Sequence, residues 1–221
     1  MKFNFIKNNI KILGLIKFLK LNLKNKFRIF NSDNEILVEE TTDLKNVIVK
    51  IKGIKNKVFF RNIKLRNTNI SVIGNNNILK IDDFSFFQNS SLVIIGNNSK
   101  IEIGKNSSIY GIKIWNLEGN GIIKIGDECL ISHDVEIRNT DSHPIYEIAT
   151  NKRINYSKNV ILKNRVWLGS GVRILKGVVI EEGNIIGQQS IISKSILEKN
   201  CICVGNGRII KKNIKWEKEF V

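Results

Sequence analysis

The chain has 221 residues, of which 42% are hydrophobic and 25% charged, a composition that predicts a folded globular unit rather than a disordered one. Lys and Arg number 36 against 20 Asp and Glu, and this excess of 16 favours acidic partners such as nucleotides, anionic glycans or lipids; an AT-rich genome is the alternative explanation. With two histidines and no paired C-x-x-C motif, a three-histidine zinc site within one chain is excluded and we expect no metal.

The first 44 residues read as a basic N-terminal cap region. Lysines interrupt the apolar segment 10–23, which is therefore too short to span a bilayer but could lie on one. No secretory cleavage pattern opens the chain, and Cys129, Cys201 and Cys203 do not have the spacing of a disulfide framework. These features predict a cytoplasmic protein, with peripheral contact at the inner face of the cytoplasmic membrane as an option for the cap.

A repeat of six residues organises most of residues 45–210. Irregular first coils are expected from about residue 45, and from residue 162 every sixth position is a large aliphatic residue. A smaller residue stands four positions after several of these. A period of six fits neither an α-helix nor a plain strand; it indicates three short strands per coil of a solenoid. The aliphatic positions of this inner column are Leu162, Leu168, Ile174, Ile180, Ile186 and Ile192.

Two interruptions and a tail complete the predicted organisation. Residues 115–121 read as a loop between coils, and residues 143–159 as a longer polar excursion that contains the only proline, Pro144. Long loops on a rigid scaffold often carry function. Residues 211–221 are expected to form a C-terminal tail, a short helix with Trp216 packed on the last coil.

The hexads, the Asp-Ser-His-Pro stretch at 141–144 and the Val-Trp-Leu-Gly stretch at 166–169 resemble the hexapeptide-repeat acyltransferase family, in particular the O-acetyltransferases that modify sugars and surface polysaccharides. The resemblance covers about residues 70–210. It implies an all-β fold, a left-handed parallel β-helix, with acetyl-CoA as donor. It also implies a homotrimer in which each active site lies between two subunits.

The resemblance assigns the catalytic base to His143. An imidazole can take the proton of a sugar hydroxyl and pass it to the departing thiolate. His143 also stands where the next inner aliphatic would be. Asp141 could orient this imidazole or bind the sugar, with a turn-forming aspartate as the alternative. His133 is likewise a candidate to bind the substrate or orient the imidazole, with a structural role or one supporting the site as the alternative.

The resemblance also implies a set of residues that bind acetyl-CoA. Trp167 would border the thioester end, and the backbone amide near Gly169 and Ser170 would donate to the oxyanion. The last members of the set are Gly187, Ser193, Lys194, Arg208 and Lys211. The family's closing Gly-Asn-Pro-Ala-basic stretch lacks its proline here and is one residue shorter, which puts the placement of Arg208 in question.

The leading hypothesis is therefore an O-acetyltransferase that esterifies a sugar hydroxyl of a bacterial capsule or lipo-oligosaccharide, with an acidic acceptor such as sialic acid suited to the basic excess. An N-acetyltransferase of an amino-sugar nucleotide is the close alternative, because the fold does not decide the acceptor. A non-catalytic solenoid scaffold is the alternative from another class. No helix-turn-helix, zinc-finger or aromatic stacking motif predicts specific nucleic-acid binding.

Overall fold

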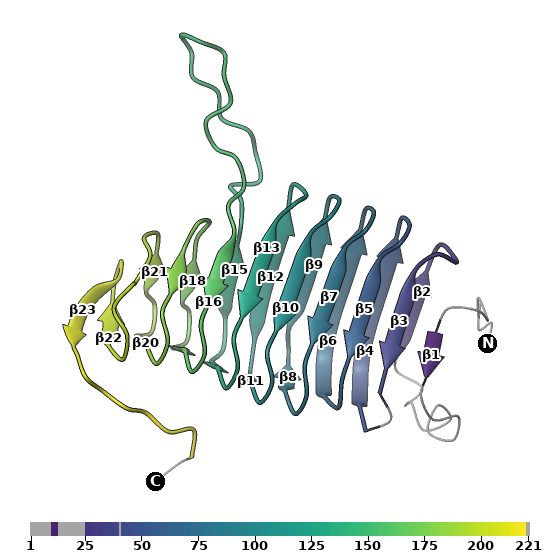
Figure 1. Ribbon diagram of the computed structural model, residues 1–221, viewed down its shortest axis with the longest axis horizontal. Coiled ribbons are helices and arrows are strands. Elements are labelled where there is room, and N and C mark those ends of the chain that lie inside the picture. Colours follow the sequence, from purple (N-terminus) through teal and green to yellow (C-terminus); the bar gives the residue numbers. More distant parts are fainter. Residues whose placement is uncertain (1–9, 13–24, 40, 220–221) are drawn as a thin grey trace.

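The computed structural model describes residues 10–12, 25–39 and 41–219, and these residues form a parallel β-solenoid that contains no helix (Figure 1). No helix in the described ranges is therefore long or apolar enough to cross a membrane. The predicted all-β fold, a left-handed parallel β-helix, is confirmed. Each coil of the chain passes along three flat faces, which we name A, B and C in the order in which a coil visits them.

Face A is an eight-stranded parallel sheet. Each of its strands comes from a different coil, so that neighbours in the sheet are about one coil apart in sequence. Its strands, in stacking order, are β1 (Ile10–Ile12), β3 (Glu35–Val38), β5 (Lys57–Phe60), β7 (Ile78–Ile81), β10 (Lys100–Ile103), β13 (Ile122–Ile125), β16 (Val160–Leu162) and β19 (Val179–Ile180).

Faces B and C form a second sheet, because two long strands, β4 (Asp43–Lys52) and β6 (Lys64–Ile73), run along both faces. Face B continues with β8 (Phe86–Gln88), β11 (Ser108–Ile109), β14 (Leu130–Ile131), β17 (Trp167–Leu168), β20 (Ile185–Ile186), β22 (Ile202–Val204) and the antiparallel β23 (Arg208–Lys211). Face C contains β2 (Lys26–Ile29), β9 (Ser91–Ile95), β12 (Ile112–Leu117), β15 (Val135–Arg138), β18 (Arg173–Ile174) and β21 (Ile191–Ile192).

The coils are of two lengths. Ile161 pairs with Val179, 18 residues later, which is three hexads. In the first coils the hydrogen-bonded positions are 22 residues apart, as between Asn34 and Asn56. These longer coils have extended strands and an asparagine-rich turn, and they explain why the hexad pattern weakens before residue 70.

The expected inner column is buried from Leu162 to Ile192, each member being at most 1% exposed. The smaller residues Val166, Val172, Val178 and Ser190 are buried beside it. In the longer coils a polar ladder joins the aliphatic core. The buried side chains of Asn34, Asn56 and Asn77 bond to one another, and Asn77 Oδ1 accepts from the Ser99 amide.

Three local expectations differ from the structure. The solenoid begins before residue 44, because β3 pairs with β5 in register; residues 1–9 and 13–24 of the expected cap lie outside the described residues. Residues 115–117 belong to β12, and only the turn at 118–120 leaves the strand. The described part of the tail forms no helix, because residues 214–218 bind along earlier coils, with Ile214 N–H bonded to Asn200 O and Trp216 on Arg165.

Candidate active site

The excursion leaves the solenoid at the corner between faces C and A. Ile123 of β13 pairs with Val160 of β16, 37 residues later instead of 22. The additional residues project from the solenoid as a hairpin-like loop, visible above β15 in Figure 1 and closed by a bridge between Tyr146 and Arg153. This is the polar excursion expected at 143–159.

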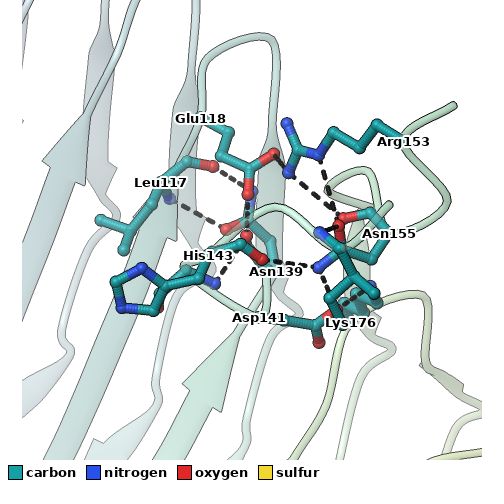
Figure 2. A network of polar contacts seen from close by, with 11 residues as sticks. Leu117, Glu118, Asn139, Asp141, His143, Arg153, Asn155 and Lys176 are labelled. Carbon is teal, nitrogen blue, oxygen red and sulfur yellow. Dashed lines mark hydrogen bonds and ion pairs between the residues drawn. The ribbon is translucent and has the colours of Figure 1, made fainter. Parts of the chain in front are cut away.

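Asn155 holds the root of this loop (Figure 2). Although it lies in a polar segment, it is only 6% exposed, and its side chain is fully bonded. Its Nδ2 donates to the carbonyl of His143 at 2.7 Å and to Asp141 Oδ2 at 3.0 Å. Its Oδ1 accepts from the Ile145 amide at 2.7 Å. The peptide groups on both sides of Pro144, directly after His143, are thus fixed by one side chain.

A second tie joins the loop to the preceding coil. Arg153 Nη2 lies 2.6 Å from Glu118 Oε2, and Thr140 donates its hydroxyl to the other oxygen of Glu118. Burial raises the pKa of Glu118, but the hydrogen bonds from Thr140 and Arg153 outweigh it, so that the pKa lies below its ordinary value. Arg153 also stacks over Tyr156, 4.9 Å from its ring centroid. The loop is therefore held by charge and hydrogen bonds rather than by apolar packing.

Asp141 faces away from the imidazole that it was expected to orient. Its carboxylate pairs with the ammonium of Lys176, from the next coil, and accepts from Asn155. The hydrogen bond from Lys176 lowers the pKa of Asp141, so that the carboxylate stays charged under ordinary conditions. In this structure Asp141 is a link between the loop root and the solenoid.

The imidazole of His143 is exposed and points away from the Asp141–Lys176 pair (Figure 2). No side-chain hydrogen bond to it occurs within the described ranges, which leaves both ring nitrogens accessible. The prediction that His143 takes the next inner slot is wrong, because the chain has left the solenoid after Thr140, which is the last buried position before the loop.

His133 lies at a different corner, between faces B and C. Its ring is exposed and tilted against that of Tyr110, with centroids 5.9 Å apart. Its carbonyl accepts from the Gly171 amide of the next coil at 3.0 Å. Face C separates it from the corner that carries His143.

The predicted thioester end lies on face B and at the corner between faces B and C. Trp167 projects outward beside the inward Leu168, and its Nε1 is buried without an acceptor in the described part of the chain. Gly169 donates its amide to Ile186 O at 2.8 Å. Of the two amides expected to bind an oxyanion, Ser170 N–H is therefore the one without an acceptor among the described residues.

Packing alone explains both predicted glycines. A Cβ atom on Gly169 would lie 2.7 Å from Gln188 N, and one on Gly187 would lie 2.9 Å from Val204 Cγ1. Consecutive coils approach each other this closely where the chain turns from face B to face C. These positions therefore shape the corner whether or not a ligand lies against it.

The remaining predicted residues gather near the C-terminal end. Ser193 and Lys194 follow β21 at the corner between faces C and A, and Ser193 bonds to Asn206 Oδ1 through its amide and its hydroxyl. Lys194 is exposed, and no carboxylate in the described ranges pairs with it. Arg208 and Lys211 are exposed in β23.

One chain does not bring these groups together. His143 stands on the corner between faces C and A, whereas Trp167 projects from face B, which lies opposite that corner in a three-sided coil. A single reacting centre that uses both would need His143 from one copy of the chain and Trp167 from another.

The tail contributes contacts that the sequence did not predict. Trp216 packs on Trp167 with ring centroids 5.8 Å apart, donates Nε1–H to Arg165 O at 3.0 Å, and accepts at its own carbonyl from Arg165 Nη2 at 2.7 Å. Asn155, Glu118 and Lys176 were also not singled out as functional residues. A period of six identifies buried aliphatic positions but gives no signal for a buried amide inside a polar loop.

Comparison with known proteins identifies similar enzymes. The chain is 36% identical over 146 residues to a polysialic acid O-acetyltransferase of Neisseria meningitidis, covering 65% of this chain and 67% of that enzyme. It is 37% identical over 97 residues to the polysialic acid O-acetyltransferase of Escherichia coli O1:K1, but this match spans only 31% of that enzyme's length. The crystal structure of the polysialic acid O-acetyltransferase OatWY superposes with a TM-score of 0.80 at 32% identity, covering 89% of this chain and 92% of that one. The polySia-specific acetyltransferase NeuO gives 0.78 at 30% identity, with coverage of 89% and 90%. No family model matches the chain.

Proposed function

The chain belongs to the hexapeptide-repeat O-acetyltransferase family, and on that premise we propose that it transfers acetyl from acetyl-CoA to a sialic acid hydroxyl of a bacterial surface polysaccharide, with His143 as base. The observation that carries the proposal is an accessible imidazole whose following backbone, the His143 carbonyl and the Ile145 amide, is fixed by Asn155. Likeness to two polysialic acid O-acetyltransferases over nine-tenths of the chain supports the acceptor class.

In the proposed reaction a ring nitrogen of His143 accepts the proton of the sugar hydroxyl as the oxygen attacks the thioester carbonyl. The carbon–oxygen bond forms and the carbonyl electrons move onto its oxygen. When this tetrahedral intermediate collapses, the carbon–sulfur bond breaks, and the imidazolium returns the proton to the leaving thiolate. His143 is thus base and then acid, and general acid–base catalysis of this kind typically contributes about 10²–10⁴-fold.

Several residues fit a coenzyme A donor. The Ser170 amide is a free donor for the developing oxyanion, and the unsatisfied Trp167 Nε1 is a buried donor beside it on face B. Lys194, Arg208 and Lys211 supply exposed positive charge suited to the donor's phosphates. Acetyl-CoA would supply the activated acyl group, while these residues hold and orient it.

A homotrimer with shared active sites is part of the proposal. The opposed placement of His143 and Trp167 supports it, because two copies can supply both groups to one acetyl. A cytoplasmic location also remains a proposal, and the three free, buried cysteines fit a reducing compartment. Contact of the N-terminal segment with the membrane stays a prediction.

The test is release of free coenzyme A from acetyl-CoA with polysialic acid as acceptor, for the wild type, His143→Ala and His133→Ala. We expect turnover to fall at least about 100-fold in His143→Ala and to change little in His133→Ala. Loss in His133→Ala with retention in His143→Ala would reverse the assignment of the base. Alkali-labile product acetyl groups would identify an ester, and stable ones an amide and hence the N-acetyltransferase alternative.

A further inference from the structure

Face C carries uncompensated positive charge on its N-terminal coils. Its outward side chains there include four cations, and no carboxylate of the described residues pairs with any of them. Among the residues outside the described ranges, segments 1–9, 13–24 and 220–221 contain no Asp or Glu, and Glu40 is the one carboxylate there. The four cations are Lys26, Arg28, Lys50 and Lys52.

On the other faces, several cations form ion pairs with carboxylates. On face A, Lys57 lies 3.7 Å from Glu35, and Lys80 lies 2.8 Å from Asp82. On the face B half of β4 and β6, Arg66 pairs with Asp43. Along face C the first carboxylate on a strand is Glu136 of β15, and it is occupied by Arg138 at 2.7 Å. Unpaired lysines also occur on face A, as at Lys100 and Lys124, but strands of that face carry carboxylates as well. What distinguishes the N-terminal coils of face C is that residues 26–29 and 47–52 carry four cations and no carboxylate.

A column of outward side chains on face C runs toward the loop that carries His143. Strand pairing aligns one outward column along it, consisting of Arg28, Lys50, Ser71, Val93, Trp115 and Arg138. Five inter-strand steps at about 4.8 Å make the column about 24 Å long. Immediately after Arg138 the chain enters the loop that carries His143. The middle of the column is small and uncharged, so that an extended chain could lie flat across it.

We propose that face C binds the acceptor as an extended acidic polysaccharide, with its remote sugars on the basic coils while one sugar reaches His143. This inference rests on the proposed function and adds the surface that selects a polymer. Carboxylates repeated along a glycan would complement the four cations, and Trp115 offers part of an apolar ring near the loop. The surface lies on earlier coils than His143 and Trp167.

The test compares two variants that lose the same three charges. Arg28→Gln/Lys50→Gln/Lys52→Gln neutralises face C, and Lys100→Gln/Lys124→Gln/Lys163→Gln neutralises unpaired lysines on and just after the strands of face A. Acetyl transfer is measured with long polysialic acid and with a sialic acid dimer. For the face C variant we expect KM for the polymer to rise about tenfold at unchanged kcat, with no change for the dimer. The face A variant should match the wild type on both acceptors.

Binding without acetyl-CoA gives an independent readout. The dissociation constant for polysialic acid should depend less on NaCl concentration in the face C variant than in the face A variant, because fewer ionic contacts form. Equal behaviour of the two variants, with an active wild type, would overturn the face C surface while leaving the proposed function intact. A wild type that acetylates neither acceptor would overturn the proposed function and this surface with it. A single-stranded oligonucleotide of equal charge that binds face C more tightly than the polymer does would assign the face to nucleic acid instead.

Discussion

An imidazole that takes a proton from an alcohol must be held within hydrogen-bond distance of it, yet His143 stands on a loop outside the solenoid core. Asn155 resolves this difficulty by bonding the His143 carbonyl and the Ile145 amide at 2.7 Å each. It touches no reacting atom in this arrangement and is a positioning residue. The positioning of the proposed base therefore depends on one buried amide.

Replacing that amide by a carboxylate tests its role. Asn155→Asp keeps the acceptor oxygen but replaces the NH2 group and its two donated hydrogen bonds by a second oxygen, and it places a second carboxylate beside Asp141. We expect kcat to fall about 30-fold while KM for acetyl-CoA and the thermal midpoint stay near those of the wild type, since misplacement of a reacting group costs rate. Steady-state kinetics and thermal unfolding measure these quantities.

Asn151→Asp is the matched control, because Asn151 lies exposed in the same loop and no side-chain hydrogen bond of it occurs in the described structure. Its kcat should equal that of the wild type. Equal losses in both variants would mean that negative charge anywhere on the loop lowers activity, and Asn155 would lose its positioning role.

Asp141 leads to a prediction about pH. The hydrogen bond from Lys176 holds the pKa of Asp141 below its ordinary value. The ionic contact between the two residues is therefore complete above the ordinary pKa of an aspartate, and it is lost only as pH falls through the lowered pKa. Across about pH 5 to 9 the carboxylate is then always charged. We expect Asp141→Asn to lower kcat without moving the acidic limb of the profile of kcat/KM against pH. A limb displaced by the substitution would show that Asp141 itself titrates in the working range.

At the scale of the element, the coil explains what the sequence could predict. The sequence predicts inner positions such as Leu168 and Ile174, because each inner slot admits only an aliphatic side chain of similar size and these slots recur strictly every six residues. In the 22-residue coils that period is replaced by paired strands and asparagine turns. There an inner slot is filled by Asn56, whose burial depends on partners in two neighbouring coils that no local pattern reveals.

The asparagine ladder is predicted to stabilise the N-terminal coils. Asn56 is fully buried, donates to Gly74 O at 2.7 Å, and accepts from the Asn77 amide at 3.0 Å. Asn56→Ala would leave these buried groups without partners, at a cost of about 2–4 kcal/mol in the free energy of unfolding. Urea unfolding measures the loss. Asn69→Ala, at an exposed position of β6, should change the value by less than about 0.5 kcal/mol; a similar loss in both would remove the ladder from the explanation.

At the scale of the whole molecule, a three-sided coil has a simple geometric consequence: a corner and the face opposite it never meet. The resemblance to a family could supply His143 and Trp167, but their separation within one chain depends on which face each coil position occupies. The 37-residue step at the loop sets that placement. Counting six-residue repeats along the sequence assigned His143 to the inner column and gave no information on this placement.

This opposition yields a complementation experiment. If each active site takes His143 from one copy and Trp167 from the next, His143→Ala and Trp167→Ala are each nearly inactive alone, but a mixed trimer contains interfaces that combine the two intact residues. Random assembly from equal amounts gives about a quarter of the wild-type activity, because each ordered interface needs one particular pair of copies. Co-expression of the two variants in equal amounts, purification of all trimers together through a tag that both chains carry, and the coenzyme A release assay measure the value. A His143→Ala/Trp167→Ala double variant mixed with wild type serves as the control for assembly: about a quarter of its interfaces also contain both intact residues, in this case from two wild-type copies. The contrary outcome is that mixed His143→Ala and Trp167→Ala trimers remain as inactive as either parent while the control is active. Both residues would then act within one chain, and the active site would not be shared between copies.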